Sequence, residues 1–190
     1  MEIEEIEKCI KELTNEKRFR HSKGVQKTAG ELAKHYGLDV KKAELAGLMH
    51  DCTKNLPPEE MMKLCDKFGC ALDDVSKLEH KLIHAPLGAY YSKNVFGIDD
   101  KEIFDAISCH TTAKANMTMF EKVLYIADVI EPNRVYDIAD QLRKMAFEDI
   151  DRAILIVLNY TINKIITNGR MLHNETINAR NYLISKGVKV

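Results

Sequence analysis

The sequence has almost no net charge, and this removes one class of function at the outset. Its 190 residues include 28 lysines and arginines and 29 aspartates and glutamates, which gives a formal net charge of −1. Nonspecific binding to a nucleic acid polymer needs an excess of positive charge over a face of the protein. Any cations that bind phosphate must therefore be gathered locally.

The chain also lacks long apolar runs. The longest run spans residues 153–158, whereas a helix that crosses a bilayer needs about 20 apolar residues. Residues 1–5 are acidic, where a secretion signal begins with a basic region followed by an apolar one. The sequence therefore predicts neither a membrane span nor a signal peptide.

Cysteines are few and show no pairing pattern. There are five, an odd number without a CxxC pair, so a disulfide framework is not expected and reduced thiols in the cytoplasm fit better. Cys52 and Cys109 each stand next to a candidate metal ligand. We interpret both as small buried residues, with a thiolate ligand as the alternative.

Apolar residues recur at helical spacing nearly throughout, and we find no strand, repeat or low-complexity linker. This predicts an all-α fold in one compact domain, residues 1–190, with a metal-site core at about 18–134 and C-terminal helices 149–187 packed on it. Helices are expected over about 3–13, 22–36, 39–50, 78–95, 100–110, 118–131, 149–168 and 174–187, with a further one after Pro57 and a break near Pro86.

The most informative feature is the adjacent pair His50–Asp51. Its neighbours complete the order H…HD…H…H…D, and each member lies near the end of an expected helix. A single histidine near a helix end, such as His35, is usually structural, so the ordered set carries the prediction. Imidazole and carboxylate ligands suit Fe, Mn, Co, Ni and Zn, and two such ions in one pocket indicate hydrolysis of a phosphate ester or anhydride. The set is His21, His50, Asp51, His84, His110 and Asp128.

Five segments carry motifs in a fixed order: Arg-His-Ser-x-x-Val at 20–25, Leu-Met-His-Asp-x-x-Lys at 48–54, His-Ala-Pro-Leu-Gly-Ala at 84–89, His-Thr-Thr at 110–112, and Tyr-Ile-Ala-Asp-x-Ile-Glu-Pro-x-Arg at 125–134. With these motifs the chain resembles the HD-domain metal-dependent phosphohydrolases. Within that superfamily it is similar to the YqeK-type symmetrical diadenosine tetraphosphate hydrolases of bacteria. Ala113 departs from the glycine common in the family, and we expect little effect.

The resemblance implies two metal ions, iron first and manganese or cobalt as alternatives. The first would be bound by His21, His50, Asp51 and Asp128, and the second by His84, His110 and a bridging Asp51. It also implies cleavage of diadenosine tetraphosphate by metal-activated water into two ADP, with Asp51, Lys54 and Asp128 as catalytic residues. A homodimer is a further expectation from the family.

A tetraphosphate needs cations beyond the metals. Lys54 and Arg134 are the first candidates, although Lys54 could be a solvated loop residue and Arg134 could pair with Glu131 or Asp137. Tyr90, Tyr91, Phe96 and Tyr125 are expected in the core, whereas His80 is ambiguous because it precedes His84 by four residues on one expected helical face. The predicted substrate contacts are Arg18, Lys54, His80, Thr111, Arg134, Arg170 and His173, with Arg18 preferred over Arg20 and Lys23.

Three alternatives stay open. One is another HD phosphohydrolase that acts on a nucleotide monophosphate or a cyclic nucleotide. The second is a di-iron oxygenase, because some HD-domain proteins use the same ligand order for oxygen chemistry. The third is a nucleotide-binding module without catalysis. The complete ligand set favours the enzyme.

Overall fold

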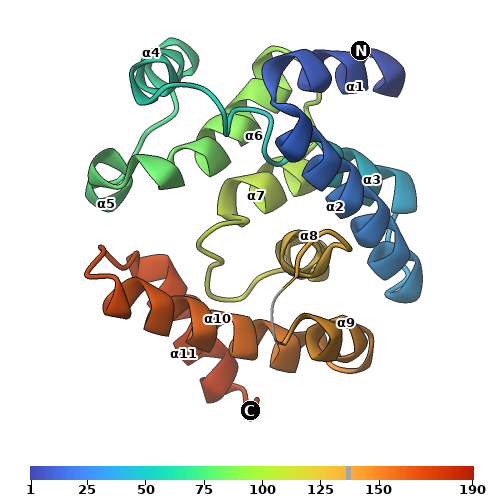
Figure 1. The fold of residues 1–190 in the computed structure, drawn as a ribbon, viewed down its shortest axis with the longest axis vertical. Coiled ribbons are helices and arrows are strands. Elements are labelled where there is room, and N and C mark those ends of the chain that lie inside the picture. The colour runs from blue at the N-terminus through green and yellow to red at the C-terminus, as the bar shows by residue number, and fades with distance from the viewer. Residues whose placement is uncertain (136–137) are drawn as a thin grey trace.

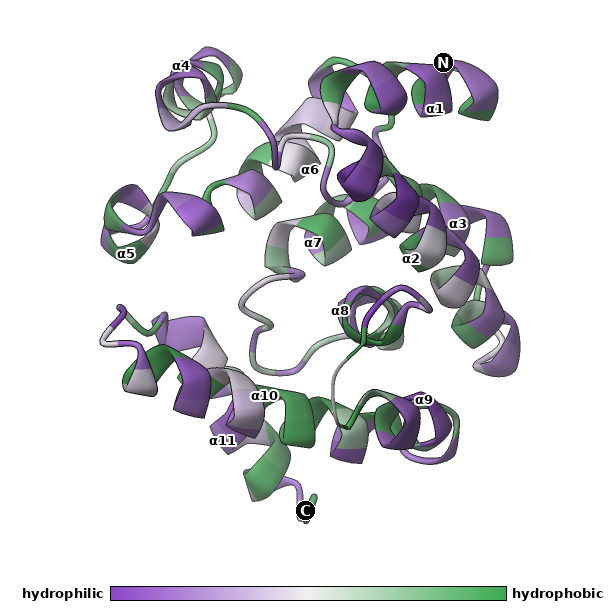
Figure 2. Ribbon diagram, in the orientation of Figure 1, coloured by the Kyte–Doolittle hydropathy of each residue, from purple (hydrophilic) through white to green (hydrophobic). Residues whose placement is uncertain are grey.

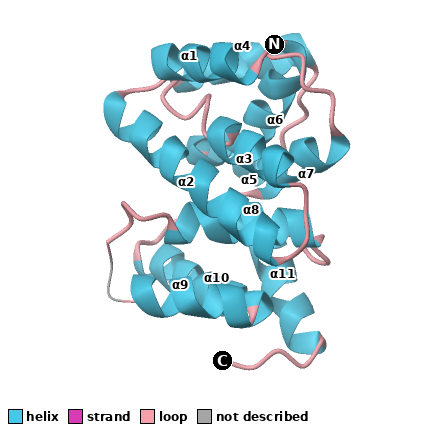
Figure 3. Cartoon of the chain, turned by 90° about the vertical axis from the view of Figure 1, so that its right-hand side faces the viewer, coloured by secondary structure: helices cyan, strands magenta, loops and turns pink. Residues whose placement is uncertain are grey.

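The computed structural model describes residues 1–135 and 138–190, and these residues form helices without a strand (Figures 1 and 3). This confirms the predicted all-α class. The elements are α1 Ile3–Leu13, α2 Glu16–His35, α3 Val40–Met49, α4 Pro58–Phe68, α5 Asp74–Leu78, the 3-10 helix η1 His80–Leu82, α6 His84–Asn94, α7 Lys101–Cys109, α8 Met119–Ile130, α9 Ala139–Glu148, α10 Ile150–Thr167 and α11 Asn174–Ser185.

Side-chain caps begin several of these helices. Asp39, Asp100 and Asp149 accept hydrogen bonds from backbone N–H groups of α3, α7 and α10, and Thr118 forms the predicted capping box with Glu121 at α8. These caps satisfy N–H groups that have no partner within the helix. The predicted starts of these four helices are confirmed.

Two expected boundaries were wrong because the capping residue is a different one. Helix α2 begins at Glu16 rather than near residue 22, since the Asn15 side chain accepts a hydrogen bond from the N–H of Arg18. His21 therefore lies within a helix and not before one. At α11 the cap is His173 rather than Asn174, and its ring accepts a hydrogen bond from the N–H of Glu175.

The helix expected over residues 78–95 is three pieces, α5, η1 and α6. The break lies at Glu79 and Ile83, not at Pro86, because Pro86 falls in the first turn of α6, where its missing N–H needs no partner. His80 is consequently an exposed residue of η1 and does not share a helical face with His84. The periodicity also missed α9.

Helix α8 is the centre of the fold. It packs against α2, α3, α7, α9 and α10 and lies among them in Figures 1 and 2, and most of its residues are apolar. A helix that is apolar nearly all round must be covered on every side. Its position between the α2–α3 pair and the α9–α10 pair brings Asp128, near its C-terminal end, to the junction of the two. No helix among residues 1–135 and 138–190 combines the length and apolarity needed to span a membrane.

Helices α2 and α3 approach each other at Gly47. A Cβ atom there would lie 2.8 Å from Cα of Gln26 and 2.9 Å from the carbonyl oxygen of Val25. Backbone cannot move aside as a flexible side chain can. Glycine at this position therefore sets the distance between the helix that carries His21 and the one that is followed by His50.

We expect Gly47→Ala to lower the free energy of unfolding by about 1–3 kcal/mol, because the methyl group would push α3 from α2. Gly30→Ala is the matched control: its Cβ would meet only the side chain of Glu44, and alanine favours the helix by about 1 kcal/mol. Urea unfolding of both variants measures the difference. Equal losses would contradict the role given to Gly47.

Candidate metal centre and adjoining cavity

The structure brings the six candidate ligands together from five places in the fold. His21 comes from the second turn of α2, and His50 and Asp51 follow the end of α3 at Met49. His84 is the first residue of α6, His110 follows α7, and Asp128 lies on α8. The end of α3 at this point confirms that the helix stops where His50 and Asp51 must converge. Side chains of these residues are almost fully buried except for Asp128, whose side chain is 19% exposed.

Asp51 divides the four histidines into two pairs. Its Oδ2 atom lies 3.8 Å from Nε2 of His21 and 3.4 Å from Nε2 of His50. Its Oδ1 atom lies 3.0 Å from Nε2 of His84 and 3.4 Å from Nε2 of His110. A carboxylate with one oxygen toward each pair can bridge two ions. Asp128 joins the first pair, with Oδ1 2.9 Å from Nε2 of His21.

Hydrogen bonds fix the tautomer of three histidines. Nδ1 of His50 lies 2.7 Å from the carbonyl oxygen of Gly47, and His84 and His110 make the same contact, at 2.7 Å, with Lys81 and Ile107. Each acceptor is the carbonyl three residues earlier. A carbonyl oxygen only accepts, so Nδ1 must carry the proton and Nε2 must hold a lone pair.

Those lone pairs face one another and need a cation. Nε2 of His84 lies 3.2 Å from Nε2 of His110, and neither has a proton to share with the other. Nε2 of His21, Nε2 of His50 and Oδ1 of Asp51 are buried without a hydrogen-bond partner. Buried polar groups are rarely left without a hydrogen-bond partner. This donor set of imidazole nitrogen and carboxylate oxygen fits transition-metal ions.

The two carboxylates are ionised in this setting. Burial acts to raise the pKa of Asp51, but its interactions with His50, His110 and His84 outweigh burial and hold the pKa well below its ordinary value. Burial opposes ionisation of Asp128 too, and its close contact with His21 helps to hold its pKa well below the ordinary value. For His84, burial and the nearby charge of Lys54 lower the pKa to about 4. Neutral imidazole and ionised carboxylate are the forms that bind metal.

Three predicted cations border the ligands. Arg18 donates to Oδ2 of Asp51 at 2.6 Å, and Nζ of Lys54 lies 2.7 Å from Nε2 of His84. Arg134 donates to Oδ1 of Asp128 at 2.9 Å. Lys54, whose side chain is 30% exposed, is therefore not a solvated loop residue. Of the alternatives for Arg134, Glu131 is not its ion-pair partner at this centre, and Asp137 lies outside the described residues.

The other predicted substrate contacts have partners or surroundings of their own. Arg170 pairs with Glu79, and His173 lies 3.1 Å from Asp73. Thr111 and His173 line a smaller cavity of ≈ 270 Å³ beside α6 and α7. His80 is exposed. The structure therefore groups Arg18, Lys54 and Arg134 with the ligands, whereas the roles of His80, Thr111, Arg170 and His173 stay predictions.

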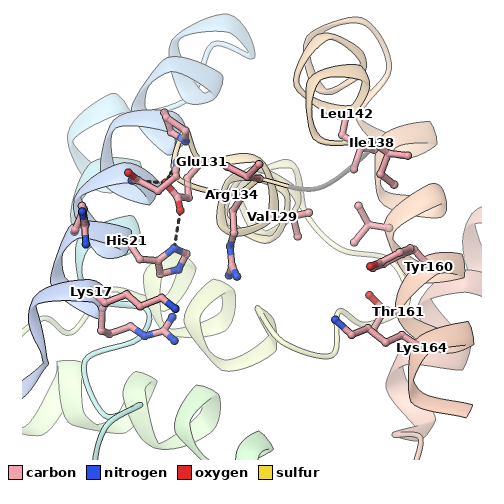
Figure 4. Close-up of a pocket in the computed structure, with 16 residues that line it drawn as sticks. Lys17, His21, Val129, Glu131, Arg134, Ile138, Leu142, Tyr160, Thr161 and Lys164 are labelled. Carbon is pink, nitrogen blue, oxygen red and sulfur yellow. Dashed lines mark hydrogen bonds and ion pairs between the residues drawn. The ribbon is translucent and has the colours of Figure 1, made fainter. Parts of the chain in front are cut away.

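A larger cavity of ≈ 860 Å³ opens beside His21 between α2, the end of α8, α9 and α10 (Figure 4). Its volume is within the range of small-molecule sites, roughly 300–1,000 Å³. The lining contains the cations Lys17, Arg18, Arg20, Arg134 and Lys164. Lys17 and Lys164 were not singled out in the sequence because an isolated lysine on a helix gives no signal.

Residues 18–145 match the HD domain family. The chain belongs to the HD-domain family. This stretch holds all six candidate ligands, so the match and the geometry concern the same site. The likeness to the YqeK-type members extends over nearly the whole chain and is shown by the relatives that follow.

The symmetrical bis(5'-nucleosyl)-tetraphosphatase of Bacillus subtilis is 38% identical over 187 residues, 97% of this chain and 99% of that protein. The protein of the same name from Halalkalibacterium halodurans is 37% identical, covering 92% of this chain and 93% of its own. The crystal structure of a predicted HD superfamily hydrolase involved in NAD metabolism from Clostridium acetobutylicum shares 43% identity with a TM-score of 0.95 over 98% of both chains.

Two further details of this HD-domain protein concern residues beside the ligands. Burial raises the pKa of the Cys109 thiol to about 12, and burial also raises that of Cys52. Both thiols are therefore protonated and belong to no candidate ligand group among the described residues. Ala113 has φ 57° and is fully buried. A residue other than glycine adopts this left-handed backbone conformation at a cost in free energy, which explains the glycine common in the family. The sequence did not reveal this cost.

The aromatic residues expected in the core divide into two groups. Tyr125 and Phe96 are buried as predicted, and Tyr90 and Tyr91 are half-buried. All four pack against the hydrophobic clusters of the fold.

Glu131 is a functional candidate to which the sequence assigned no role at the centre. It is 1% exposed, and its Oε1 atom lies 3.1 Å from Nδ1 of His21. Its Oε2 atom accepts hydrogen bonds from the backbone and side chain of Asn133, at 2.7 and 2.8 Å. Gly24 leaves the space for this carboxylate, since a Cβ there would collide with it. Glu131 thus gives His21 the acceptor that a carbonyl gives the other three histidines.

We expect Glu131→Gln to weaken metal affinity about 10- to 100-fold, as loss of a partner that orients a ligand does. One amide oxygen cannot accept from both His21 and Asn133. Metal titration by calorimetry measures the change.

Glu121→Gln is the control for this variant. Glu121 is another buried glutamate, 2% exposed, but it lies in the first turn of α8, where it caps the helix start and pairs with Lys114. The Glu121→Gln variant should lose stability while retaining its affinity for metal. Unchanged affinity in Glu131→Gln would refute the orienting role.

Proposed function

We propose that this HD-domain protein is a metal-dependent hydrolase that cleaves diadenosine tetraphosphate symmetrically into two ADP. The observation that carries the proposal is Asp51, with one oxygen toward each pair of imidazole lone pairs. The names of the relatives from Bacillus subtilis and Halalkalibacterium halodurans support the substrate.

The ligand sets follow the division at Asp51. His21, His50, Asp51 and Asp128 would hold one ion, and His84, His110 and Asp51 would hold the other. We propose iron for both ions, and the chemistry of the ligands allows manganese or cobalt as well. Bound metal would supply a Lewis acid and lower the pKa of water toward neutrality, so that water can attack phosphorus.

The residues of the chain would do the rest. Asp51 and Asp128 would keep their charge at neutral pH because their pKa values are held low. Lys54 and Arg134 would stabilise the negative charge on phosphoryl oxygens, with Arg134 offering its planar fork from the rim of the larger cavity. Arg18 would release Asp51 and bind phosphate once metal neutralises that carboxylate. No serine or cysteine nucleophile is needed.

The rival functions fit less well. Lys54 and Arg134 beside the ligands suit a phosphate substrate, and a di-iron oxygenase gives them no task. A nucleotide-binding module without catalysis has no use for two pairs of metal ligands around one carboxylate. Another HD phosphohydrolase differs only in its products, which the assay below identifies.

We also propose that the chain works as one HD-type domain over residues 1–190, as a homodimer in the cytoplasm. The metal-site core at about 18–134 and the C-terminal helices at 149–187 both line the larger cavity. Its five cysteines are free thiols, which fits a reducing compartment.

The first test uses the protein loaded with iron or with manganese. Incubated with diadenosine tetraphosphate, it should yield ADP alone when products are resolved by anion-exchange chromatography. ATP with AMP would keep a hydrolase but overturn the position of cleavage. Absence of turnover at full metal content would reject the function.

Asp51→Asn should lose metal and activity together, because an amide cannot bridge two ions as a carboxylate does. Metal content by elemental analysis and the turnover rate should both fall at least about tenfold. Asp74→Asn alters an exposed carboxylate, 97% exposed, and should change neither. Full metal content with normal turnover in Asp51→Asn would refute the assignment.

Arg134→Gln should raise KM for diadenosine tetraphosphate about tenfold or more, the loss expected for a charge-assisted hydrogen bond to phosphate. Metal content should stay near that of the wild type. Arg152→Gln changes an arginine outside the larger cavity and serves as the control. Loss of metal from Arg134→Gln, measured by elemental analysis, would show that Arg134 supports Asp128 instead of substrate.

A further inference from the structure

The larger cavity has two chemically different ends. Near the metal ligands it is lined by Lys17, Arg18, Arg20 and Arg134, and its far side is formed by α9 and α10. Figure 4 shows Tyr160, Thr161 and Lys164 facing His21, Lys17 and Arg134 across the open space. A ligand that fills the cavity must therefore be anionic at one end and suited to an apolar, aromatic surface at the other.

The far side is apolar apart from Tyr160, Thr161 and Lys164 of α10. Side chains of Val129, Ile138, Leu142 and Val157 line it, and none of these offers a hydrogen bond. Tyr160 is the one tyrosine, phenylalanine or tryptophan among the described lining residues, and the residue is 49% exposed. An exposed aromatic side chain at the edge of an apolar pocket suits a planar group that stacks on it.

Lys164 adds a charge one turn further along the same helix. Its Nζ atom lies 5.9 Å from the centre of the Tyr160 ring, and its side chain reaches into the cavity toward Lys17 (Figure 4). The helix therefore presents an aromatic ring with an adjacent cation. A nucleoside 5'-phosphate has the same order of groups: a planar base, then a sugar, then a negative charge.

We propose that α10 recognises one nucleoside of the substrate, with its base on the ring of Tyr160 and its first phosphate near Lys164, an inference that rests on the proposed function. The phosphate chain then runs from Lys164 toward Arg134 and the metal ligands. Tyr160 is a specificity-determining residue, because it separates nucleoside polyphosphates from polyphosphate alone. Stacking accepts any base, so adenine and guanine dinucleotides are both substrates.

The test compares a substrate that has nucleosides with one that has none. Tyr160→Ala in the metal-loaded protein should raise KM for diadenosine tetraphosphate about tenfold or more, the loss expected when a base loses its stacking partner. The rate kcat should change little, and KM for inorganic tetraphosphate should stay the same. Tyr160→Phe keeps the ring and should restore KM.

A second tyrosine and lysine pair provides a matched control. At the end of α11 the Nζ atom of Lys186 lies 5.2 Å from the ring centre of Tyr182, outside the cavity. Tyr182→Ala and Lys186→Gln should leave KM for both substrates unchanged, whereas Lys164→Gln should raise KM for both, because both carry phosphate groups. Equal effects of Tyr160→Ala on both substrates, or none on either, would overturn the proposal.

Titration of the metal-loaded protein with ADP keeps this inference separate from the proposed function. Binding should be about tenfold or more weaker in Tyr160→Ala than in the wild type. If the wild type fails to cleave the dinucleotide yet loses ADP affinity through this change, the hydrolase assignment fails and the nucleoside site stands. If cleavage occurs and ADP affinity is unchanged, the nucleoside site is rejected and the hydrolase stands.

Discussion

The structure depends on one buried carboxylate shared by four imidazoles. Asp51 is 2% exposed, and charges of this kind are tolerated in a protein interior only when they are compensated. The compensation comes from α2, α6, α7 and the end of α3, so the burial of Asp51 requires those helices to meet. Asp128 comes from α8, which lies within the same core. The packing of the helices therefore also sets the positions of the candidate ligands.

Three of the four histidines at this centre lie at helix ends, and the backbone there orients their rings. A histidine that follows the end of a helix can turn its Nδ1 back to the carbonyl three residues earlier, as His50 and His110 do, while His84 does the same at a helix start. Each ring thereby satisfies a backbone acceptor and presents its other nitrogen to the metal. His21 lies within a helix whose carbonyls are engaged, so it needs Glu131 as acceptor.

The cavity arises where the helices around α8 separate. On one side α2 presents basic residues, and on the other side α10 presents an aromatic and apolar surface. The segment that carries Arg134 is held by Arg143 of α9, which donates to the carbonyl oxygens of Ile130 and Arg134 at 2.8 and 2.7 Å. Arg143 thus ties the segment that carries Arg134 to α9.

The sequence by itself determined the all-α class, most helix starts and the six candidate ligands, because apolar periodicity, capping residues and an ordered motif are all local signals. It placed the break before α6 wrongly and missed α9, since weak periodicity does not separate short helices from loops. Only the tertiary structure decided that Asp51 faces two histidine pairs, that Glu131 serves His21, and that Tyr160 and Lys164 face the centre from α10. These relations join residues far apart in the chain, and only the packing of helices around α8 sets the distances between them.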